Sequence, residues 1–156
     1  MIEIAIPGYG ELQLEHLVLD YNGTLAVDGR LLFGVRERLE RLAEKLTIHV
    51  VTADTFGKAA DYLAGIPCQL EALPPGNQAE AKRDFVRALG AERCVCVGNG
   101  RNDQLMLKEA ALGIAVMQDE GAAVVTLMAA DVMAADIQSA LELLMRPLRL
   151  TATLRA

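Results

Sequence analysis

The sequence contains no tryptophan, and aromatic residues make up only 4% of it. Hydrophobic residues nevertheless account for 53% and charged residues for 23% of the 156 residues. This composition is typical of a folded globular protein and not of a disordered chain. The core must therefore be built mainly from Leu, Val, Ile, Ala and Met, and the length fits a single domain with a substantial core.

An excess of basic residues is also missing, since 15 Lys and Arg face 21 Asp and Glu and the formal net charge is -6. A net negative protein is a poor partner for nucleic acid or for an anionic membrane. No apolar run is long enough to span a membrane. Residues 1–7 include Glu3 and no basic region, so they do not have the pattern of a signal peptide. We therefore expect a cytoplasmic protein that binds neither nucleic acid nor membrane.

Cysteine is scarce, and the three that occur, Cys68, Cys94 and Cys96, show no framework spacing that would predict disulfides. Cys94 and Cys96 lie two residues apart in an apolar run, so they share one face of a strand. A metal site at this pair would need two further ligands. We predict buried structural thiols instead.

Short apolar runs alternate with helical patterns along the chain, which predicts parallel strands joined by helices. The expected strands are 2–6, 12–14, 16–20, 47–52, 67–70, 93–97, 112–116 and 131–133. The expected helices are 31–45, 56–63, 77–89, 102–110, 122–128 and 137–145. The first two strands should form an N-terminal hairpin within residues 1–15. The C-terminal tail, residues 146–156, should be extended, with no partner in its own domain.

Polar groups follow three of the expected core strands, at Asp20, at Thr52 and at Gly98-Asn99-Gly100. The ligand site of an open parallel sheet lies at the carboxyl ends of its strands, so these segments should converge. A carboxylate at a strand end can act as a nucleophile toward phosphorus. Gly23 would let backbone N–H groups face an anion, and Thr24 adds a hydroxyl donor. The alternative is an Asx turn in an ordinary loop.

These motifs resemble the haloacid dehalogenase (HAD) superfamily. Its members carry Asp-x-Asp-x-Thr after an apolar strand, and here LVLDYNGTLA places Asp20, Asn22 and Thr24 in that pattern. The second motif of the superfamily is a Thr or Ser at the end of the next core strand. Thr52 in IHVVTAD matches it.

The third motif, a lysine ahead of the fourth core strand, is matched best by Lys82 in AEAKRDFVRALG. The fourth motif, Gly-Asp-Gly-x-Asn-Asp, is matched by residues 98–103, GNGRND. Within the superfamily the chain looks most like small soluble proteins akin to the phosphorylation domain of P-type ATPases. The resemblance implies a three-layer, Rossmann-like α/β domain over residues 1–156. It also implies a central, mainly parallel sheet and no large cap domain.

The resemblance further implies a Mg²⁺-dependent phosphohydrolase that acts on a small phosphorylated molecule through an aspartyl-phosphate on Asp20. The implied catalytic residues are Asp20, Asn22 and Lys82. The implied phosphate-binding residues are Asn22, Gly23, Thr24, Thr52, Ala53, Lys82 and Asn102. The implied metal ligands are Asp20, Asn22, Asn99 and Asp103. Capless relatives often shield the site with a neighbouring subunit, so a homo-oligomer is also expected.

Two amides replace expected acids in these motifs. Asn22 stands where phosphatases have the Asp that protonates the leaving group, and Asn99 stands where a metal-binding Asp is usual. We therefore expect slow hydrolysis and weak Mg²⁺ binding. Two alternatives stay open. One is a phosphate-binding or regulatory module without turnover, and the other is an oligomeric scaffold in which Leu148–Leu154 docks on a neighbour.

Several of these residues also have purely structural interpretations. Thr52 could simply end a strand. Lys82 could be a solvated helix lysine, with Lys58 or Arg83 in its proposed place. Asn102 and Asp103 could cap the following helix. For the two histidines, we favour satisfied structural side chains in or beside strands: His16 and His49.

Overall fold

A six-stranded parallel sheet forms the centre of the computed structural model, which describes residues 1–53 and 57–156. The strand order is β10-β9-β8-β3-β6-β7. The strands are β3 (His16–Asp20), β6 (Thr47–Thr52), β7 (Gln69–Ala72), β8 (Cys94–Gly98), β9 (Leu112–Val116) and β10 (Val132–Ala134). The predicted α/β class with a parallel sheet is confirmed. Asp54, expected to be a surface acid, and Phe56, the expected start of a helix, lie outside the described residues.

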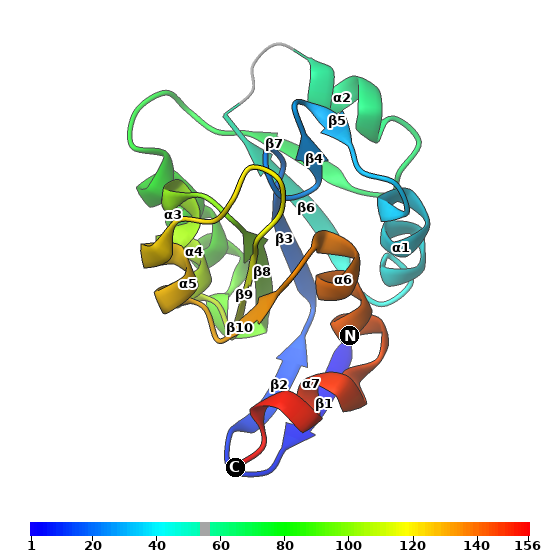
Figure 1. The fold of residues 1–156 in the computed structure, drawn as a ribbon, viewed down its shortest axis with the longest axis vertical. Helices are drawn as coiled ribbons and strands as arrows, with labels where there is room; N and C mark the ends of the chain where they lie inside the picture. The colour runs from blue at the N-terminus through cyan, green and yellow to red at the C-terminus, as the bar shows by residue number, and fades with distance from the viewer. Residues whose placement is uncertain (54–56) are drawn as a thin grey trace.

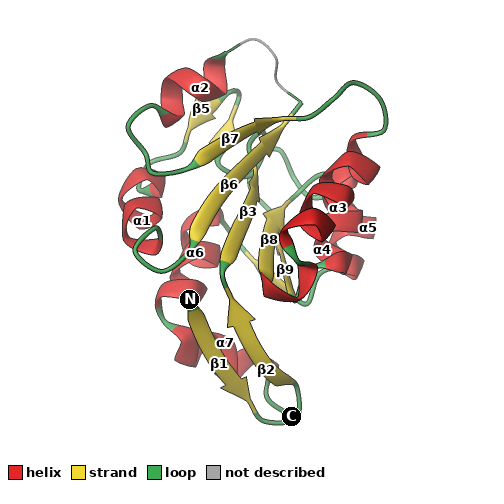
Figure 2. Ribbon diagram, turned by 180° about the vertical axis from the view of Figure 1, so that it is seen from behind, coloured by secondary structure: helices red, strands yellow, loops and turns green. Residues whose placement is uncertain are grey.

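Helices cover both faces of this sheet (Figures 1 and 2). One face carries α1 (Val35–Leu42) and α6 (Ile137–Met145), and the other carries α3 (Gln78–Leu89), α4 (Gln104–Glu109) and α5 (Val124–Ala129). The short helix α2 (Lys58–Leu63) lies near the carboxyl ends of the strands (Figure 1). No large cap domain is present in the part of the chain that the structure describes. The predicted three-layer architecture is therefore confirmed.

The alternation of side chains along β3 decides which helix reaches its last residue. Leu17 and Leu19 belong to the apolar cluster under α1 and α6, whereas Val18 belongs to the cluster under α3 and α4. Because side chains alternate between the faces of a strand, Asp20 falls on the same face as Val18. That face is covered by α3, the helix that carries Lys82.

The first expected helix, 31–45, is shorter in the structure and begins at Val35. Gly34, just before it, has φ 79°, a left-handed conformation that cannot continue a right-handed helix toward its amino end. The preceding residues form a small hairpin that the sequence analysis did not predict, β4 (Ala26–Val27) with β5 (Arg30–Leu31). The helix expected at 102–110 begins as a 3₁₀ turn, Arg101–Asp103, and becomes α-helical at Gln104.

The N-terminal hairpin is confirmed as β1 (Ile2–Ile6) and β2 (Gly10–Leu14), and it extends away from the amino ends of the central strands (Figure 1). The expectation for the C-terminal tail was wrong. Pro147 does not merely end α6, since it opens a further helix, α7 (Pro147–Leu154), as its fixed φ allows at a first helical position. Leu150 on α7 is fully buried in the main apolar cluster, and the N–H of Ala156 donates to the carbonyl of Pro7. The tail therefore packs within its own domain.

Two leucines of α7 provide a matched test of this packing. Leu150→Ala should lower the free energy of unfolding by about 2 kcal/mol, the low end for buried Leu→Ala changes, because a terminal helix can relax around the lost volume. Leu148, with 84% of its surface exposed, should tolerate the same change. Urea unfolding of both variants measures the difference. Equal midpoints for the two variants would contradict the packing of α7.

Every helix in the described part of the chain is too short or too polar to cross a bilayer. The cysteines of β8 are buried as predicted, and the Cys94 thiol donates to the carbonyl of Gly90 at 3.3 Å. The histidines form a pair, with His16 Nδ1 3.2 Å from His49 Nε2. Among the described residues His49 Nδ1 is buried without a hydrogen-bond partner, so the prediction of a satisfied histidine is wrong for this atom.

Acidification should weaken the fold through His49. Burial, and to a smaller extent the neighbouring His16, lowers the pKa of His49 below its usual 6.5. The unfolded chain therefore binds this proton at a higher pH than the native protein does. The contribution of His49 to stability is complete above about pH 6.5 and is lost as the pH falls toward the native pKa. Wild type should thus lose more stability than His49→Phe between pH 7 and pH 5, measured by urea unfolding. Parallel losses in the two proteins would contradict this.

Candidate active site

A buried ion cluster lies at the carboxyl end of β3. The Lys82 ammonium, from α3, donates to Asp20 Oδ1 at 2.7 Å and to Asp103 Oδ1 at 2.6 Å. Only 1% of the Lys82 surface is exposed. The two alternatives for this lysine lie elsewhere, because Lys58 is exposed on α2 and Arg83 pairs with Asp84. Lys82 is therefore the cation that the fold brings to Asp20.

The cluster holds two carboxylates and one ammonium in a buried place, which shifts the pKa values of Asp20 and Lys82. Burial, and then the charge of Asp103, raises the pKa of Asp20 to about 7, although Lys82 and Thr24 act in the opposite direction. Burial disfavours the Lys82 ammonium, but the carboxylates of Asp20 and Asp103 outweigh it and raise the pKa of Lys82. Lys82 therefore stays charged at neutral pH, while Asp20 is easily protonated when no further cation is near.

Backbone donors hold Asp103 in place behind the lysine. Asp103 Oδ2 accepts hydrogen bonds from the N–H groups of Asn99, at 3.0 Å, and Gly100, at 2.9 Å. A Cβ at Gly98 would collide with the Asp103 side chain, so glycine is required for this close approach. Asp103 is the last residue of the 3₁₀ turn and precedes α4; its side chain caps the start of the turn by accepting from the N–H of Gly100, and it makes no capping bond to α4. It also orients Lys82, so the two roles coexist.

The other oxygen of Asp20 contacts the loop that follows β3. The Thr24 hydroxyl lies 3.1 Å from Asp20 Oδ2 and 3.2 Å from Asn99 Oδ1. Asn99 Nδ2 donates to the carbonyl of Gly121 at 2.9 Å, which turns its Oδ1 toward Thr24. A Cβ on Gly23, which has φ 81°, would collide with the Asn99 side chain. The oxygens of Asp20, Thr24 and Asn99 therefore lie close together, although Asn99 comes from a separate segment.

The backbone donors of Gly23 and Thr24 do not match the expectation that they face an anion. The N–H of Gly23 donates to the carbonyl of Ala26 at 2.7 Å, and that of Thr24 donates to the carbonyl of Tyr21 at 3.2 Å. The loop closes on itself in a tight turn, and this turn uses both donors. Gly23 and Thr24 therefore shape the loop and hold Asp20, and direct phosphate contacts by these N–H groups find no support here.

The remaining predicted residues lie around the cluster with different exposures. Thr52 is buried at the end of β6, the strand adjacent to β3. Asn22, Ala53 and Asn102 are exposed. Asn102 Oδ1 lies 3.5 Å from the Lys82 ammonium, a weak contact. The segments that follow β3, β6 and β8 thus reach one edge of the sheet, as the sequence predicted.

The sequence analysis missed one residue that supports the loop, Gln118. Its Nε2 donates to the carbonyls of Gly23, at 2.9 Å, and Thr24, at 2.8 Å. Its Oε1 accepts from the N–H of Ile137 at 2.9 Å. One amide side chain therefore ties this loop to the start of α6. Gln118 follows β9 at the same edge of the sheet, so the strand-end argument, extended to this strand, would have found it.

The donor atoms around Asp20 are oxygens, which decides what metal they could hold. Within residues 1–53 and 57–156, no three His, Cys, Asp or Glu side chains are placed to hold a metal together. A metal here would rely on the Asp20 carboxylate together with neutral oxygens such as Asn99 Oδ1. Oxygen donors suit a hard cation such as Mg²⁺. The residues present therefore fit Mg²⁺ in chemical type, with fewer charges than three carboxylates would provide.

Comparison with solved structures identifies proteins that share this fold. A cobalt-bound deoxy-D-mannose-octulosonate 8-phosphate phosphatase from Haemophilus influenzae superposes with a TM-score of 0.71 and 11% identity, over 92% of this chain and 94% of that one. The corresponding phosphatase from Moraxella catarrhalis, solved with magnesium, phosphate and a KDO molecule, gives 0.68 and 15%, over 91% and 94%. The catalytic domain of the CPx-ATPase CopB-B gives 0.61 and 21%, over 73% of this chain and 45% of that one. The protein has the fold of the haloacid dehalogenase superfamily.

Comparison of sequences identifies two closely related proteins. The uncharacterised protein MJ0073 from Methanocaldococcus jannaschii is 42% identical over 84 residues, which cover 51% of this chain and 90% of MJ0073. The uncharacterised MJ0072 of the same organism is 49% identical over 39 residues, or 25% and 89%. No family model matches the chain. The chain belongs to the family of MJ0073.

Proposed function

We propose that this protein is a Mg²⁺-dependent phosphohydrolase that acts on a small phosphorylated molecule through an aspartyl-phosphate on Asp20. The observation that carries the proposal is the pair of contacts that fixes the Asp20 carboxylate: one oxygen contacts Lys82 and the other contacts Thr24. A purely structural ion pair would need only the contact with Lys82, and it would not require a second group to fix the other oxygen at the end of a strand. The structural neighbours named above include phosphatases, which agrees with the proposal.

The reaction needs two displacements at phosphorus. In the first, an Asp20 oxygen bonds to phosphorus while the bond from phosphorus to the leaving oxygen breaks, and that oxygen takes a proton from solvent. In the second, water attacks phosphorus, its proton passes to solvent, and the Asp20 carboxylate is released with inorganic phosphate. The Lys82 ammonium, held by Asp103, neutralises charge on Asp20 and on the phosphoryl group. Such positioning and charge neutralisation provide most of the catalysis of phosphoryl transfer.

Mg²⁺ would be held by Asp20, Asn99 Oδ1 and the backbone carbonyl of Asn22, and it would supply positive charge to the phosphoryl oxygens. Asp103 is less suited to this role than the sequence suggested. Lys82 uses one of its oxygens, and two backbone N–H groups use the other. We therefore assign Asp103 to the orientation of Lys82. Thr52, Ala53 and Asn102, at the rim, stay candidates for contacts with the phosphoryl group or the rest of the substrate.

Acetyl phosphate and p-nitrophenyl phosphate test the proposal directly. With Mg²⁺, the protein should release phosphate slowly and incorporate one acid-stable, hydroxylamine-labile phosphoryl group. Asp20→Asn should abolish both signals, and so should removal of Mg²⁺ by EDTA. The matched control is Asp28→Asn, on the exposed turn between β4 and β5. If wild type shows neither turnover nor Asp20-dependent labelling, the protein is not this enzyme.

A second function is favoured by Asn22 and Asn99, which remove two acids from the site. In that case the protein would bind a phosphorylated ligand without hydrolysing it. Inorganic phosphate with Mg²⁺ would then raise the unfolding temperature of wild type, and no phosphate would be released from either substrate. Turnover at ordinary phosphatase rates would rule this function out.

A further inference from the structure

A pocket of about 740 Å³ lies on the side of the molecule where the β4–β5 hairpin meets the loop after β9 and the start of α6. Val27, Leu32 and Ile137 supply apolar walls. Phe33 also lines the pocket although 89% of its surface is exposed, an unusual state for a large aromatic side chain. The volume lies within the range of pockets that enclose small organic ligands.

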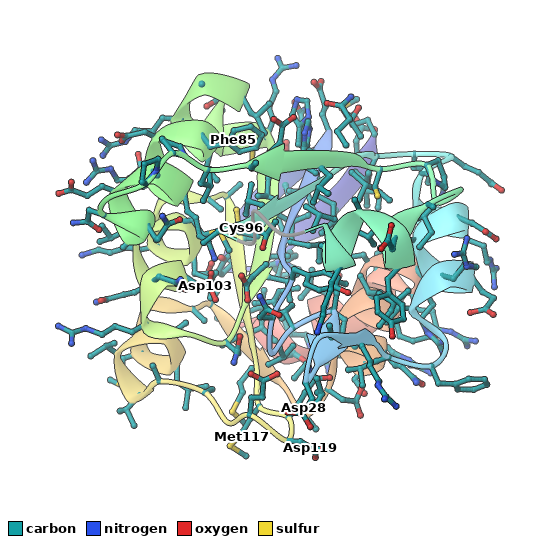
Figure 3. All side chains as sticks on the ribbon, turned by 90° about the horizontal axis from the view of Figure 1, so that it is seen from above. Asp28, Phe85, Cys96, Asp103, Met117 and Asp119 are labelled. Atoms are coloured by element: carbon teal, nitrogen blue, oxygen red, sulfur yellow. The ribbon has the colours of Figure 1, made fainter. Side chains whose placement is uncertain are left out.

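The charged residues that line this pocket have one sign, although Arg30 lies opposite Val27 on the same hairpin. Asp119 and Asp136 line it, and none of its lining residues, all of which the structure describes, is Lys, Arg or His. Two further acids are adjacent, because the backbone N–H of Asp28 donates to the Glu120 carboxylate at 3.3 Å. Figure 3 shows Asp28, Met117 and Asp119 gathered at this side of the molecule. Arg38, on the neighbouring α1, is paired with Glu142.

A second acidic pocket, between β7 and α3, makes a useful contrast. It has a volume of about 500 Å³ and contains Glu71, Glu80 and Asp84 beside Phe85. Its charge is partly neutralised, since Arg83 pairs with Asp84 at 2.9 Å. The pocket at the β4–β5 hairpin combines apolar walls, an exposed aromatic ring and two acids that pair with no Lys or Arg among the described residues, although Asp136 also accepts from the N–H of Ser139 at the start of α6.

We propose that the pocket at the β4–β5 hairpin binds an organic cation with an apolar body and an ammonium group. The carboxylates of Asp119 and Asp136 attract positive charge and repel phosphates and carboxylates. Phe33 offers a ring face, which attracts an ammonium group through its quadrupole. Among the described residues Asp119 has no hydrogen-bond or ion-pair partner that would compete for the ligand. The site is separate from the ion cluster at Asp20, and the proposal does not depend on hydrolysis.

The pocket nevertheless contacts the loop after β3 through one side chain. Gln118 lines the pocket, and its amide donates to the carbonyls of Gly23 and Thr24. A ligand in the pocket therefore packs against the group that holds the loop after Asp20. A bound ligand should therefore change the environment of Gly23 and Thr24 as well as that of the pocket residues.

Titration of the whole protein with phenylbutylamine, followed by backbone amide NMR, tests the proposal. Shifts should cluster at residues 27–33, 117–121 and 135–138 and extend to 23–24. Phenylbutanol should bind more weakly, and phenylbutyrate should bind weakest of the three. Asp119→Asn and Phe33→Ala, both at exposed positions, should each weaken amine binding by about 2–5-fold, since exposed ion pairs and cation–π contacts are modest. Asp84→Asn, in the other acidic pocket, should leave amine affinity unchanged.

Three results would overturn the proposal. The first is the absence of saturable amine binding. The second is equal binding of phenylbutylamine and phenylbutyrate. The third is a set of shifts centred on residues 71–85 and weakened by Asp84→Asn, which would assign the cation to the other pocket. All three are read without any phosphate turnover, so they are independent of the proposed phosphohydrolase.

Discussion

Asn22→Asp is expected to raise the rate of phosphate release by about 10²–10⁴-fold, the usual contribution of a general acid or base. An amide at position 22 can neither protonate a leaving oxygen nor accept a proton from water, whereas a carboxyl group can do both. In the native protein both displacements at Asp20 must therefore exchange protons with solvent. Asn22 is exposed at the rim of the site, so the change should cost little stability.

Steady-state release of phosphate from p-nitrophenyl phosphate measures this gain. Asn77→Asp is a matched control, because it adds the same charge at a helix N-cap, where Asn and Asp are nearly equivalent. The aspartyl-phosphate should also become shorter-lived in Asn22→Asp, since water would now be activated beside it. A variant no faster than Asn77→Asp would show that position 22 does not limit the reaction. A wild type that already turns over at ordinary phosphatase rates would lead to the same conclusion.

Lys82→Met is expected to destabilise the fold by about 3–5 kcal/mol at neutral pH and to abolish phosphorylation. Methionine fills a similar volume, but it leaves Asp20 and Asp103 buried without the cation between them. Removal of one partner from a buried ion pair costs this much because the remaining charge stays desolvated. The cost should be largest above neutral pH and should shrink as the pH falls to 7, because the pKa of Asp20 is already about 7 with Lys82 present and its protonation removes the repulsion.

Urea unfolding at pH 9 and at pH 7 measures the loss of stability and its pH dependence. Lys108→Met, at an exposed position on α4, is the matched control and should change stability little. Asp20→Asn combined with Lys82→Met should recover part of the lost stability, since one of the uncompensated carboxylates is then neutral. If Lys82→Met unfolded at the same urea concentration as Lys108→Met, the charge cluster would not be a buried, mutually dependent unit.

Local sequence was a good guide to most of the sheet, because buried parallel strands are short, continuous apolar runs. The runs HLVLD, TIHVVT and LGIAV match β3, β6 and β9 in the structure to the residue. The hairpin β4–β5 was missed because each of its strands is only two residues long and leaves no periodic signal. The prediction for the C-terminal tail failed for another reason. Pro147 is compatible with both the end of one helix and the start of the next, and only the apolar surface beneath Leu150 decides between them.

For the candidate site, too, some features could be predicted from local sequence and others depend on the tertiary structure. By itself the sequence determined which groups arrive at the carboxyl edge of the sheet, since a strand end and the residue type that follows it are local properties. Asp20, Thr52 and Asn99 were found for this reason, and so was the replacement of two acids by amides. The use of each group depends on distances between segments far apart in the chain. Only the tertiary structure decided that Lys82 bridges Asp20 to Asp103 and that Gln118 holds the loop after Asp20. It also decided that the N–H groups of Gly23 and Thr24 turn inward, because a donor goes to whichever acceptor the folded chain brings near.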